Sequence, residues 1–116
     1  MTVWSRDVGR GDVVLHRGAT ERVGARWEQD KLDGRGYVPV DLTGWTATLT
    51  LTLPDGTDAY AVGCATTDSG LAWAEISAGA LAGAEWDARP NGSWRIDATG
   101  PGGVVERLGE GHWHLS

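Results

Sequence analysis

The chain has 116 residues, a length that fits one domain with a core of its own. Ten lysines and arginines stand against sixteen aspartates and glutamates, and this net charge of -6 argues against binding along a phosphate backbone. The single cysteine, Cys64, allows no internal disulfide, and no apolar run is long enough to predict a signal peptide or a membrane span. We therefore expect a soluble protein made inside a cell, with neither nucleic acid nor membrane among its partners.

Short stretches of alternating apolar and polar residues predict an all-β chain. Separated by Gly, Asp, Asn and Pro, they recur at intervals of roughly ten residues, which is typical of a sandwich or barrel. We predict strands over residues 12–16, 22–28, 38–53, 59–66, 71–77, 92–99 and 104–116. The last strand is expected to be interrupted at residues 109–111, which read Gly-Glu-Gly.

The remaining segments are expected to form an arm, a loop and a short turn. Residues 1–11 show no strand pattern and predict an N-terminal arm, which leaves a single β-sandwich domain over residues 12–116. Residues 29–36 are polar and contain glycine, which indicates a loop. Residues 77–84 are the one helix candidate of the sequence, and Gly79 and Gly83 limit that helix to about one turn.

The strand within residues 38–53 has two contrasting faces, because successive side chains of a strand point to opposite sides. One face carries the apolar residues Trp45, Ala47, Leu49, Leu51 and Leu53. The other carries Thr46, Thr48, Thr50 and Thr52. The apolar face predicts a core strand. The threonine face is expected to meet water or a neighbouring subunit, and a single threonine row does not make an ice-binding surface.

About seven strands with this alternation predict an immunoglobulin-like antiparallel β-sandwich with at most one short helical turn. Four of the seven tryptophans, Trp27, Trp45, Trp94 and Trp113, alternate in phase with apolar neighbours and are expected in the core. Trp73 is ambiguous, because Leu71, Trp73 and Glu75 oppose Ala72, Ala74 and Ile76. Trp4 and Trp86 lie outside the strand pattern.

A pair of histidines is the one candidate metal site. His112 and His114 are two residues apart in a strand and point to the same side. His16 and Cys64 are the further histidine and cysteine that the chain offers. The favoured interpretation is that both histidines are exposed while Trp113 and Leu115 face the core, so no metal or other cofactor is predicted.

The sequence contains no motif of a known catalytic type. GxSxG, HExxH, a P-loop and a Cys–His pair suited to nucleophilic catalysis are all missing from it. Asp55, Asp58 and Asp68 sit in predicted turns, where aspartate is favoured for local backbone bonding. The tripeptide Arg-Gly-Asp at residues 10–12 is interpreted as a glycine-containing lead-in to the first strand. We therefore expect a protein that is not an enzyme.

The order of the turn motifs resembles a group of tailed-phage structural domains. After the opening Gly11-Asp12 come DLTG at residues 41–44, PDG at 54–56, GSW at 92–94 and ERLGEG at 106–111. This succession is similar to the LtfC-like β-sandwich proteins of actinobacterial phages and, more distantly, to the N-terminal sandwich of upper baseplate proteins. The resemblance extends from Gly11 to Leu115.

The resemblance implies a virion component, made in the cytoplasm of the host bacterium, that holds a place in an assembly. The expected role is that of a head-decoration (minor capsid) protein, because a sandwich with an arm is enough to cap a capsid lattice. Its partners would be the phage major capsid protein and copies of itself, with Val3 and Trp4 in the interface, because large aromatic residues are favoured anchors. A minor tail or baseplate subunit that binds tail proteins is the alternative. A carbohydrate-binding module with exposed tryptophans is a second alternative, of another class.

Overall fold

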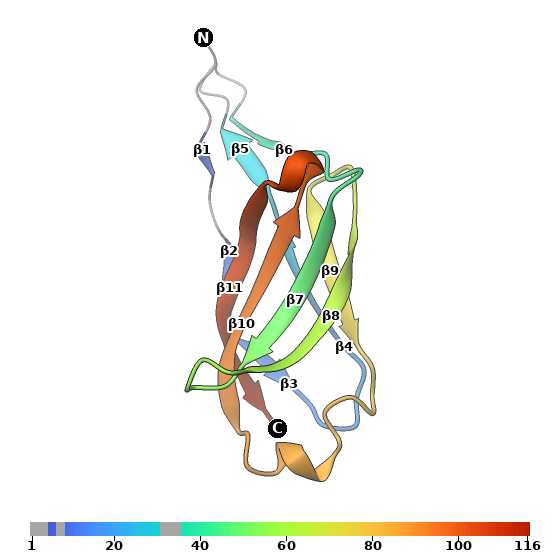
Figure 1. The fold of residues 1–116 in the computed structure, drawn as a ribbon, viewed down its shortest axis with the longest axis vertical. Coiled ribbons are helices and arrows are strands. Elements are labelled where there is room, and N and C mark those ends of the chain that lie inside the picture. The colour runs from blue at the N-terminus through green and yellow to red at the C-terminus, as the bar shows by residue number, and fades with distance from the viewer. Residues whose placement is uncertain (1–4, 7–8, 31–35) are drawn as a thin grey trace.

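The chain folds almost entirely into β-strands, as a computed structural model shows (Figure 1). The structure describes residues 5–6, 9–30 and 36–116. Within them the strands are β1 Ser5–Arg6, β2 Gly9–Arg10, β3 Val13–Leu15, β4 Glu21–Arg26, β5 Glu28–Asp30, β6 Tyr37–Pro39, β7 Thr46–Thr52, β8 Asp58–Thr66, β9 Leu71–Ile76, β10 Asn91–Thr99 and β11 Val105–Leu115. Two three-residue 3-10 turns, η1 Ala84–Trp86 and η2 Pro101–Gly103, complete these ranges. The expected all-β class is confirmed.

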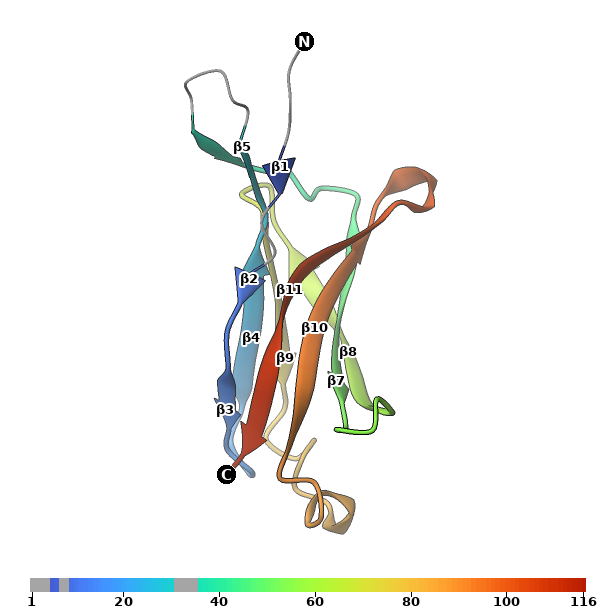
Figure 2. The same cartoon turned by 90° about the vertical axis from the view of Figure 1, so that its left-hand side faces the viewer.

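The strands form two facing layers that are joined through β8. In the larger sheet the order is β2-β11-β10-β7-β8-β9-β4, and β3 also pairs with β11. β8 pairs with β7 over most of its length and with β9 only at Ala65 and Thr66, so it passes from one layer to the other (Figure 2). The sheet is therefore nearly closed. A separate three-stranded sheet of order β1-β5-β6 extends from one end of the sandwich (Figure 1).

Short strands occur in the described parts of the predicted arm and of the predicted loop, and those in the loop correct the loop prediction. Ser5–Arg6 pairs with β5, and Gly9–Arg10 pairs in parallel with β11. Glu28–Asp30 and Tyr37–Pro39 pair with each other across the predicted loop. These ladders are two or three residues long and lack alternation, so the sequence gives no strand signal for them. Val3 and Trp4, the predicted interface residues, lie outside the described residues.

The last strand is continuous, and the predicted interruption at residues 109–111 is wrong. Gly109 and Gly111 instead make room for tryptophan. A Cβ atom on Gly111 would lie 2.7 Å from the indole nitrogen of Trp94, and one on Gly109 would lie 3.0 Å from the same ring. Gly92 accommodates Trp113 in the same way, at 2.7 Å from the indole ring. These glycines are needed because large rings cross the inner face of neighbouring strands.

Tryptophan and aliphatic side chains fill the space between the layers. Trp27, Trp94 and Trp113 are buried and Trp45 is half-buried, which confirms their expected place. Trp86 is also buried, although it stands outside the strand pattern. Its ring contacts Trp113 edge-on, with the centroids 5.9 Å apart. The turn that carries Trp86 thus closes one end of the core.

A turn held by Arg17 takes the place of the predicted helix at residues 77–84. The Arg17 guanidinium donates hydrogen bonds to the carbonyl oxygens of Leu81, Ala82 and Gly83, at 3.1 to 3.2 Å. It also forms an ion pair with Asp87, with 2.8 Å between nitrogen and oxygen. One side chain from the β3–β4 connection therefore satisfies three carbonyl groups of a segment more than sixty residues away.

The threonine face of β7 is divided between solvent and protein. Thr46 and Thr48 are exposed, whereas Thr50 and Thr52 are each 8% exposed. Arg95 of β10 and Asp58 of β8 form an ion pair of 3.5 Å, and β7 lies between those two strands. The pair therefore bridges β7 on its outer side, beside Thr50 and Thr52.

Candidate functional site

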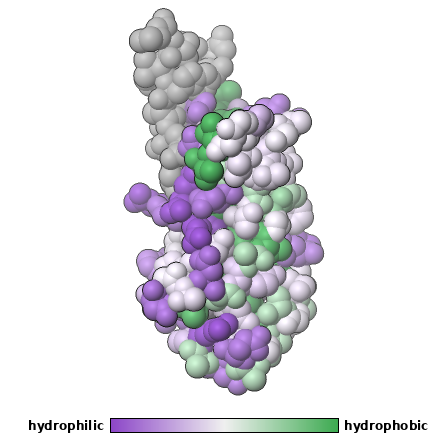
Figure 3. All heavy atoms as spheres, in the orientation of Figure 1, coloured by the Kyte–Doolittle hydropathy of each residue, from purple (hydrophilic) through white to green (hydrophobic). Residues whose placement is uncertain are grey.

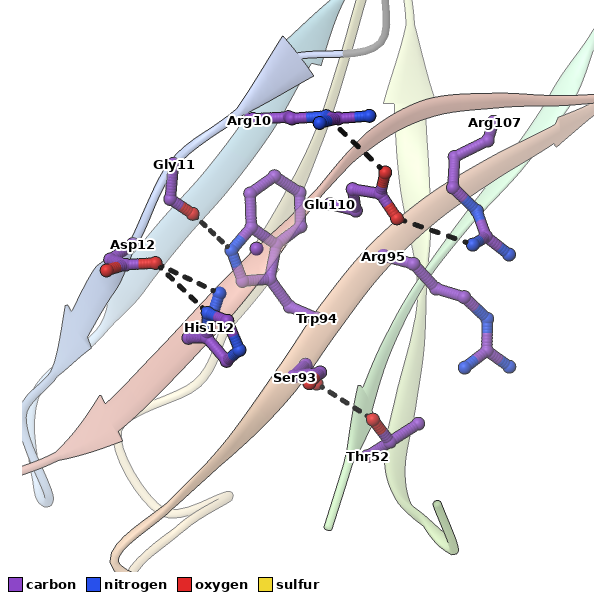
Figure 4. A pocket seen from close by; sticks show the side chains of 11 residues that line it. Arg10, Gly11, Asp12, Thr52, Ser93, Trp94, Arg95, Arg107, Glu110 and His112 are labelled. Atoms are coloured by element: carbon purple, nitrogen blue, oxygen red, sulfur yellow. Dashed lines mark hydrogen bonds and ion pairs between the residues drawn. The ribbon is translucent and has the colours of Figure 1, made fainter. Parts of the chain in front are cut away.

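A polar groove crosses the outer face of the layer that contains β2, β11, β10 and β7 (Figure 4). It is a hollow of about 570 Å³. Its lining comes from the 10–12 segment, from β10 and β11, and from Thr52 at the end of β7. Figure 3 shows hydrophilic residues gathered over β2 and β11 on this side of the molecule. Four parts of the chain that are distant in sequence thus meet at one polar surface.

One wall of the groove is the Arg10-Gly11-Asp12 tripeptide, which lies along β11. The indole nitrogen of Trp94 donates a hydrogen bond of 2.9 Å to the carbonyl oxygen of Gly11. Gly11 in turn donates from its backbone nitrogen to the carbonyl oxygen of Glu110, at 3.3 Å. The Asp12 carboxylate accepts a hydrogen bond of 3.3 Å from the backbone nitrogen of His112. The tripeptide is therefore fastened to the sheet, in agreement with its interpretation as a lead-in to the first strand.

A row of ion pairs crosses the groove. Arg10 lies 3.7 Å from Glu110, and Glu110 lies 3.6 Å from Arg107. Arg107 approaches Asp97 at 2.8 Å, and Asp97 lies 3.4 Å from Arg95. With the pair of Arg95 and Asp58 described above, charged groups of β2, β11, β10 and β8 form one connected set. We call this set, together with Asp12, the charge network.

A β-bulge brings the central pair of the charge network together. The pairing of β10 with β11 shifts between Ile96 and Asp97, so Ile96 faces Gly109 while Asp97 faces Arg107. Leu108 is the extra residue, and its side chain is buried. Bulges commonly redirect side chains in this way. The Asp97 carboxylate, as the main cause, raises the pKa of the Arg107 guanidinium above its usual value.

The charge network has little net charge and one close central pair, Arg107 and Asp97, at 2.8 Å. The charge network contains three arginines and four carboxylates. Arg95 and Asp97 are each 30% exposed, whereas Arg10 and Asp12 at its end are 79% and 67% exposed. Single exposed ion pairs contribute little to stability, whereas connected pairs hold each other's side chains in place. A groove of this type offers oriented donors and acceptors to a polar partner. Its balanced charge does not favour a polyanion.

The predicted metal-ligand candidates are not gathered in one place. Among the described residues no group of three or more His, Cys, Asp or Glu side chains has a geometry that holds a metal ion. His112 faces Asp12, with 3.4 Å between Nδ1 and the carboxylate, and His16 faces Glu21 at 2.9 Å. The interpretation that His112 and His114 are exposed is confirmed, since Trp113 is fully buried and Leu115 half-buried.

Cys64 lies on β8, where it is half-buried against the core. Burial, as the main cause, raises the pKa of its thiol to about 11. The thiol is therefore protonated near neutral pH, and only the thiolate is a strong nucleophile or metal ligand.

The predicted turn aspartates have different environments. Asp55 accepts a hydrogen bond of 2.9 Å from the backbone nitrogen of Thr57, and Asp41 accepts one of 2.9 Å from Thr43. Hydrogen bonds from these threonines lower the pKa of both carboxyl groups. Asp58 instead begins β8 and belongs to the charge network.

Trp73 is half-buried on the outer side of β9. It stands opposite Gly24 of β4, where a Cβ atom would lie 3.1 Å from the Cβ of Trp73. Of the tryptophans with a described side chain, Trp45 and Trp73 are the partly exposed ones. Trp73 is the relevant residue for a carbohydrate-binding alternative, because Trp45 packs edge-on against Trp27 at 5.3 Å.

Sequence reasoning did not identify the arginines of the groove or their partners. Arg95 and Asp97 alternate with apolar residues in the predicted strand, so their outward direction is readable. Their pairing with Arg107 and Glu110 depends on the register and on the bulge at Leu108, which no local pattern reveals.

No model of a known protein family matches the chain, and no curated protein matches it. In the part of the chain that the structure describes, no helix is long and apolar enough to cross a membrane.

Proposed function

We propose that this chain is a non-enzymatic structural protein of a tailed-phage particle, and specifically a head-decoration protein bound to the capsid surface. The resemblance to LtfC-like phage proteins supports the proposal. The motifs that carry the resemblance are structural elements of the sandwich. Asp41 and Gly44 shape the turn before β7, and Gly92 makes room for Trp113.

The observation that carries the proposal is the charge network of the groove. Arg107 and Asp97 at its centre already orient one another at 2.8 Å, so docking a polar segment of the capsid protein there costs less side-chain entropy. An alternation of opposed charges along the groove favours a complementary surface and disfavours others. We therefore take the groove as the capsid-facing site.

Attachment of many copies would make a modest site sufficient. Each chain would bury a small patch, and its effective affinity would rise through the repeated lattice and through contacts with neighbouring copies. The net charge of -6 would keep the free chains apart before assembly and away from packaged DNA.

A charge reversal in the groove tests the site. Arg107→Glu would place a carboxylate beside Asp97 and Glu110, and we expect at least a tenfold loss of chain bound to purified heads. Arg22→Glu is the matched control, because Arg22 pairs with Glu75 on the exposed outer side of β4 and β9. Circular dichroism would verify that both variants fold. Equal occupancy of Arg107→Glu and of the parent chain would argue against a capsid-facing groove.

The interface that the sequence predicts at Val3 and Trp4 stays a prediction. Trp4→Ala should leave the fold intact and reduce incorporation into particles. Binding of the parent chain to isolated tails rather than heads would favour the tail or baseplate alternative. Quenching of Trp fluorescence by glycans, abolished in Trp73→Ala, would favour the carbohydrate-binding alternative.

A further inference from the structure

The middle of β8 is an open strand edge. A bulge at Ala59 interrupts its pairing with β7, and pairing with β9 begins only at Ala65. Between these points, over residues 60–64, no strand of the described part of the chain pairs with β8 on the side away from β7. Both cartoon views show β8 leaving β9 and following β7 (Figures 1 and 2). Half of the backbone donors and acceptors of these five residues therefore lack a strand partner.

The side chains of this edge are uncharged and small or apolar. Tyr60, Val62 and Cys64 point toward the core and remain partly exposed, whereas Ala61 and Gly63 lie on the outer face. By contrast β4, the last strand in the order of this sheet, carries Glu21, Arg22 and Arg26. Charged residues at an edge are a common protection against strand pairing between molecules. β4 has that protection, and β8 lacks it.

We propose that β8 pairs with β8 of a second copy in an antiparallel arrangement about a two-fold axis at Val62. The occupant must be an extended strand, because unpaired ladder groups are what the edge offers. A second copy fits, because an uncharged edge brings no like-charge repulsion in a protein of net charge -6. Pairing also covers the half-buried Tyr60, Val62 and Cys64 of both molecules.

The two-fold axis defines the register. Residues that face each other must point to the same side of the sheet, so the axis passes through a residue. An axis through Val62 uses the whole open segment. It places Ala61 opposite Gly63 of the second copy, and Tyr60 opposite Cys64. The β11-β10-β7-β8 layers of the two molecules then join into one continuous sheet.

The pairing is weak by its size. Five residues span about 17 Å of strand, and the contact is far smaller than the roughly 800 Å² per partner of a stable complex. We expect a dissociation constant on the order of a millimolar. Free chains would remain monomers when dilute and would pair where a surface concentrates them.

A charge exchange on the outer face tests the register. Both positions accept a longer side chain, because Ala61 is exposed and nothing lies within 4 Å of a Cβ atom on Gly63. Ala61→Lys/Gly63→Lys places like charges opposite each other twice, which is destabilising. Ala61→Lys/Gly63→Glu places opposite charges there instead. The two variants change the same positions, so any common loss of stability cancels.

The measurement is the concentration dependence of sedimentation and of the backbone amide shifts, from about 20 μM to about 1 mM. For the parent chain we expect shifts that depend on concentration and cluster in residues 60–64. Ala61→Lys/Gly63→Lys should weaken association at least tenfold, whereas Ala61→Lys/Gly63→Glu should retain or strengthen it. Equal behaviour of the two variants, shifts confined to another edge, or no dependence in the parent chain would overturn the proposal. Because purified chain is used, failure here leaves the virion role to its own test.

Discussion

Trp94 of β10 and Gly111 of β11 stand directly opposite each other, and the Trp94 indole occupies the space that a side chain at residue 111 would need. The ring passes beneath Gly111 and donates to the carbonyl oxygen of Gly11 beyond it. Trp113 and Gly92 form the reverse pair, in which the Trp113 indole donates to the carbonyl oxygen of Thr52 at 3.2 Å. In each of these two strands, a glycine thus leaves the space that a tryptophan of the other strand occupies.

Gly111→Ala should be strongly destabilising. The new Cβ atom would overlap the carbonyl oxygen of Gly11 and lie 2.7 Å from the indole nitrogen of Trp94, so ring or backbone must move. Overpacking of this kind costs about 1–3 kcal/mol, measurable as the free energy of unfolding in urea. Gly63→Ala is the control, because its Cβ atom would meet nothing within 4 Å. Equal stability of Gly111→Ala and the parent chain would contradict the packing described.

Trp94→Phe should release the 10–12 segment, and because phenylalanine is the smaller residue it also leaves a cavity in the core. Phenylalanine lacks the indole N–H, so the carbonyl oxygen of Gly11 loses its donor. We expect a loss of about 1–3 kcal/mol, from the lost hydrogen bond and the smaller ring, and faster hydrogen exchange at the amide of Gly11, which pairs with Glu110. Trp113→Phe removes the hydrogen bond to Thr52. In that variant, hydrogen exchange at Gly11 should change only as much as the free energy of global unfolding does. Unaltered protection in Trp94→Phe would show that the indole does not fasten the segment.

Arg17→Ala should destabilise the end of the sandwich closed by Trp86. The change leaves the carbonyl oxygens of Leu81, Ala82 and Gly83 without this donor and removes the pair with Asp87. The expected cost is about 1–3 kcal/mol. Arg22→Ala breaks an ion pair in which both side chains are at least half exposed, and should cost less than about 1 kcal/mol. Comparable losses of stability in Arg17→Ala and Arg22→Ala would contradict the role of Arg17 in holding the 81–83 turn.

Stability should decline in acid partly through Asp41 and Asp55. Hydrogen bonds from Thr43 and Thr57 lower their pKa below the ordinary value of 3.8. A lowered pKa contributes stability above the ordinary value, and that contribution is lost as pH falls through the folded value. In Asp41→Asn/Asp55→Asn the midpoint temperature should therefore vary less below about pH 4. A double variant whose midpoint temperature falls with pH in parallel with that of the parent chain would refute this assignment.

Cys64 should react slowly with alkylating reagents. Burial raises the pKa of its thiol to about 11, so little thiolate is present at about pH 8. Iodoacetamide labelling of the folded chain should be at least tenfold slower than labelling in urea. Labelling at the rate of the unfolded chain would contradict the burial of the thiol and its raised pKa.

Local patterns predicted the parts of the fold that depend on neighbouring residues. Alternation placed Leu49 and Leu51 of β7 in the core, and turn chemistry predicted the reversal at Asp55 and Gly56. The same rules misread Gly109 and Gly111, because glycine in a strand marks either a break or the approach of a large ring. Only the register between β10 and β11 decides between these meanings.

The groove was beyond local reasoning for the same physical cause. Arg107 meets Asp97 only because Leu108 bulges inward, and Arg10 reaches Glu110 through a two-residue parallel ladder without alternation. The open edge of β8 likewise follows from a change of partner near Ala65 that its sequence does not signal. Trp86 enters the core through a turn held by Arg17, more than sixty residues away.

The most direct test of the proposed function is to locate the chain in assembled particles. Virions made with and without a labelled copy would be purified and imaged by electron microscopy. The proposal predicts copies distributed over the head and missing from heads made without the chain. Copies confined to the tail would replace decoration by a tail role, and particles that contain no copy at all would contradict the structural role itself.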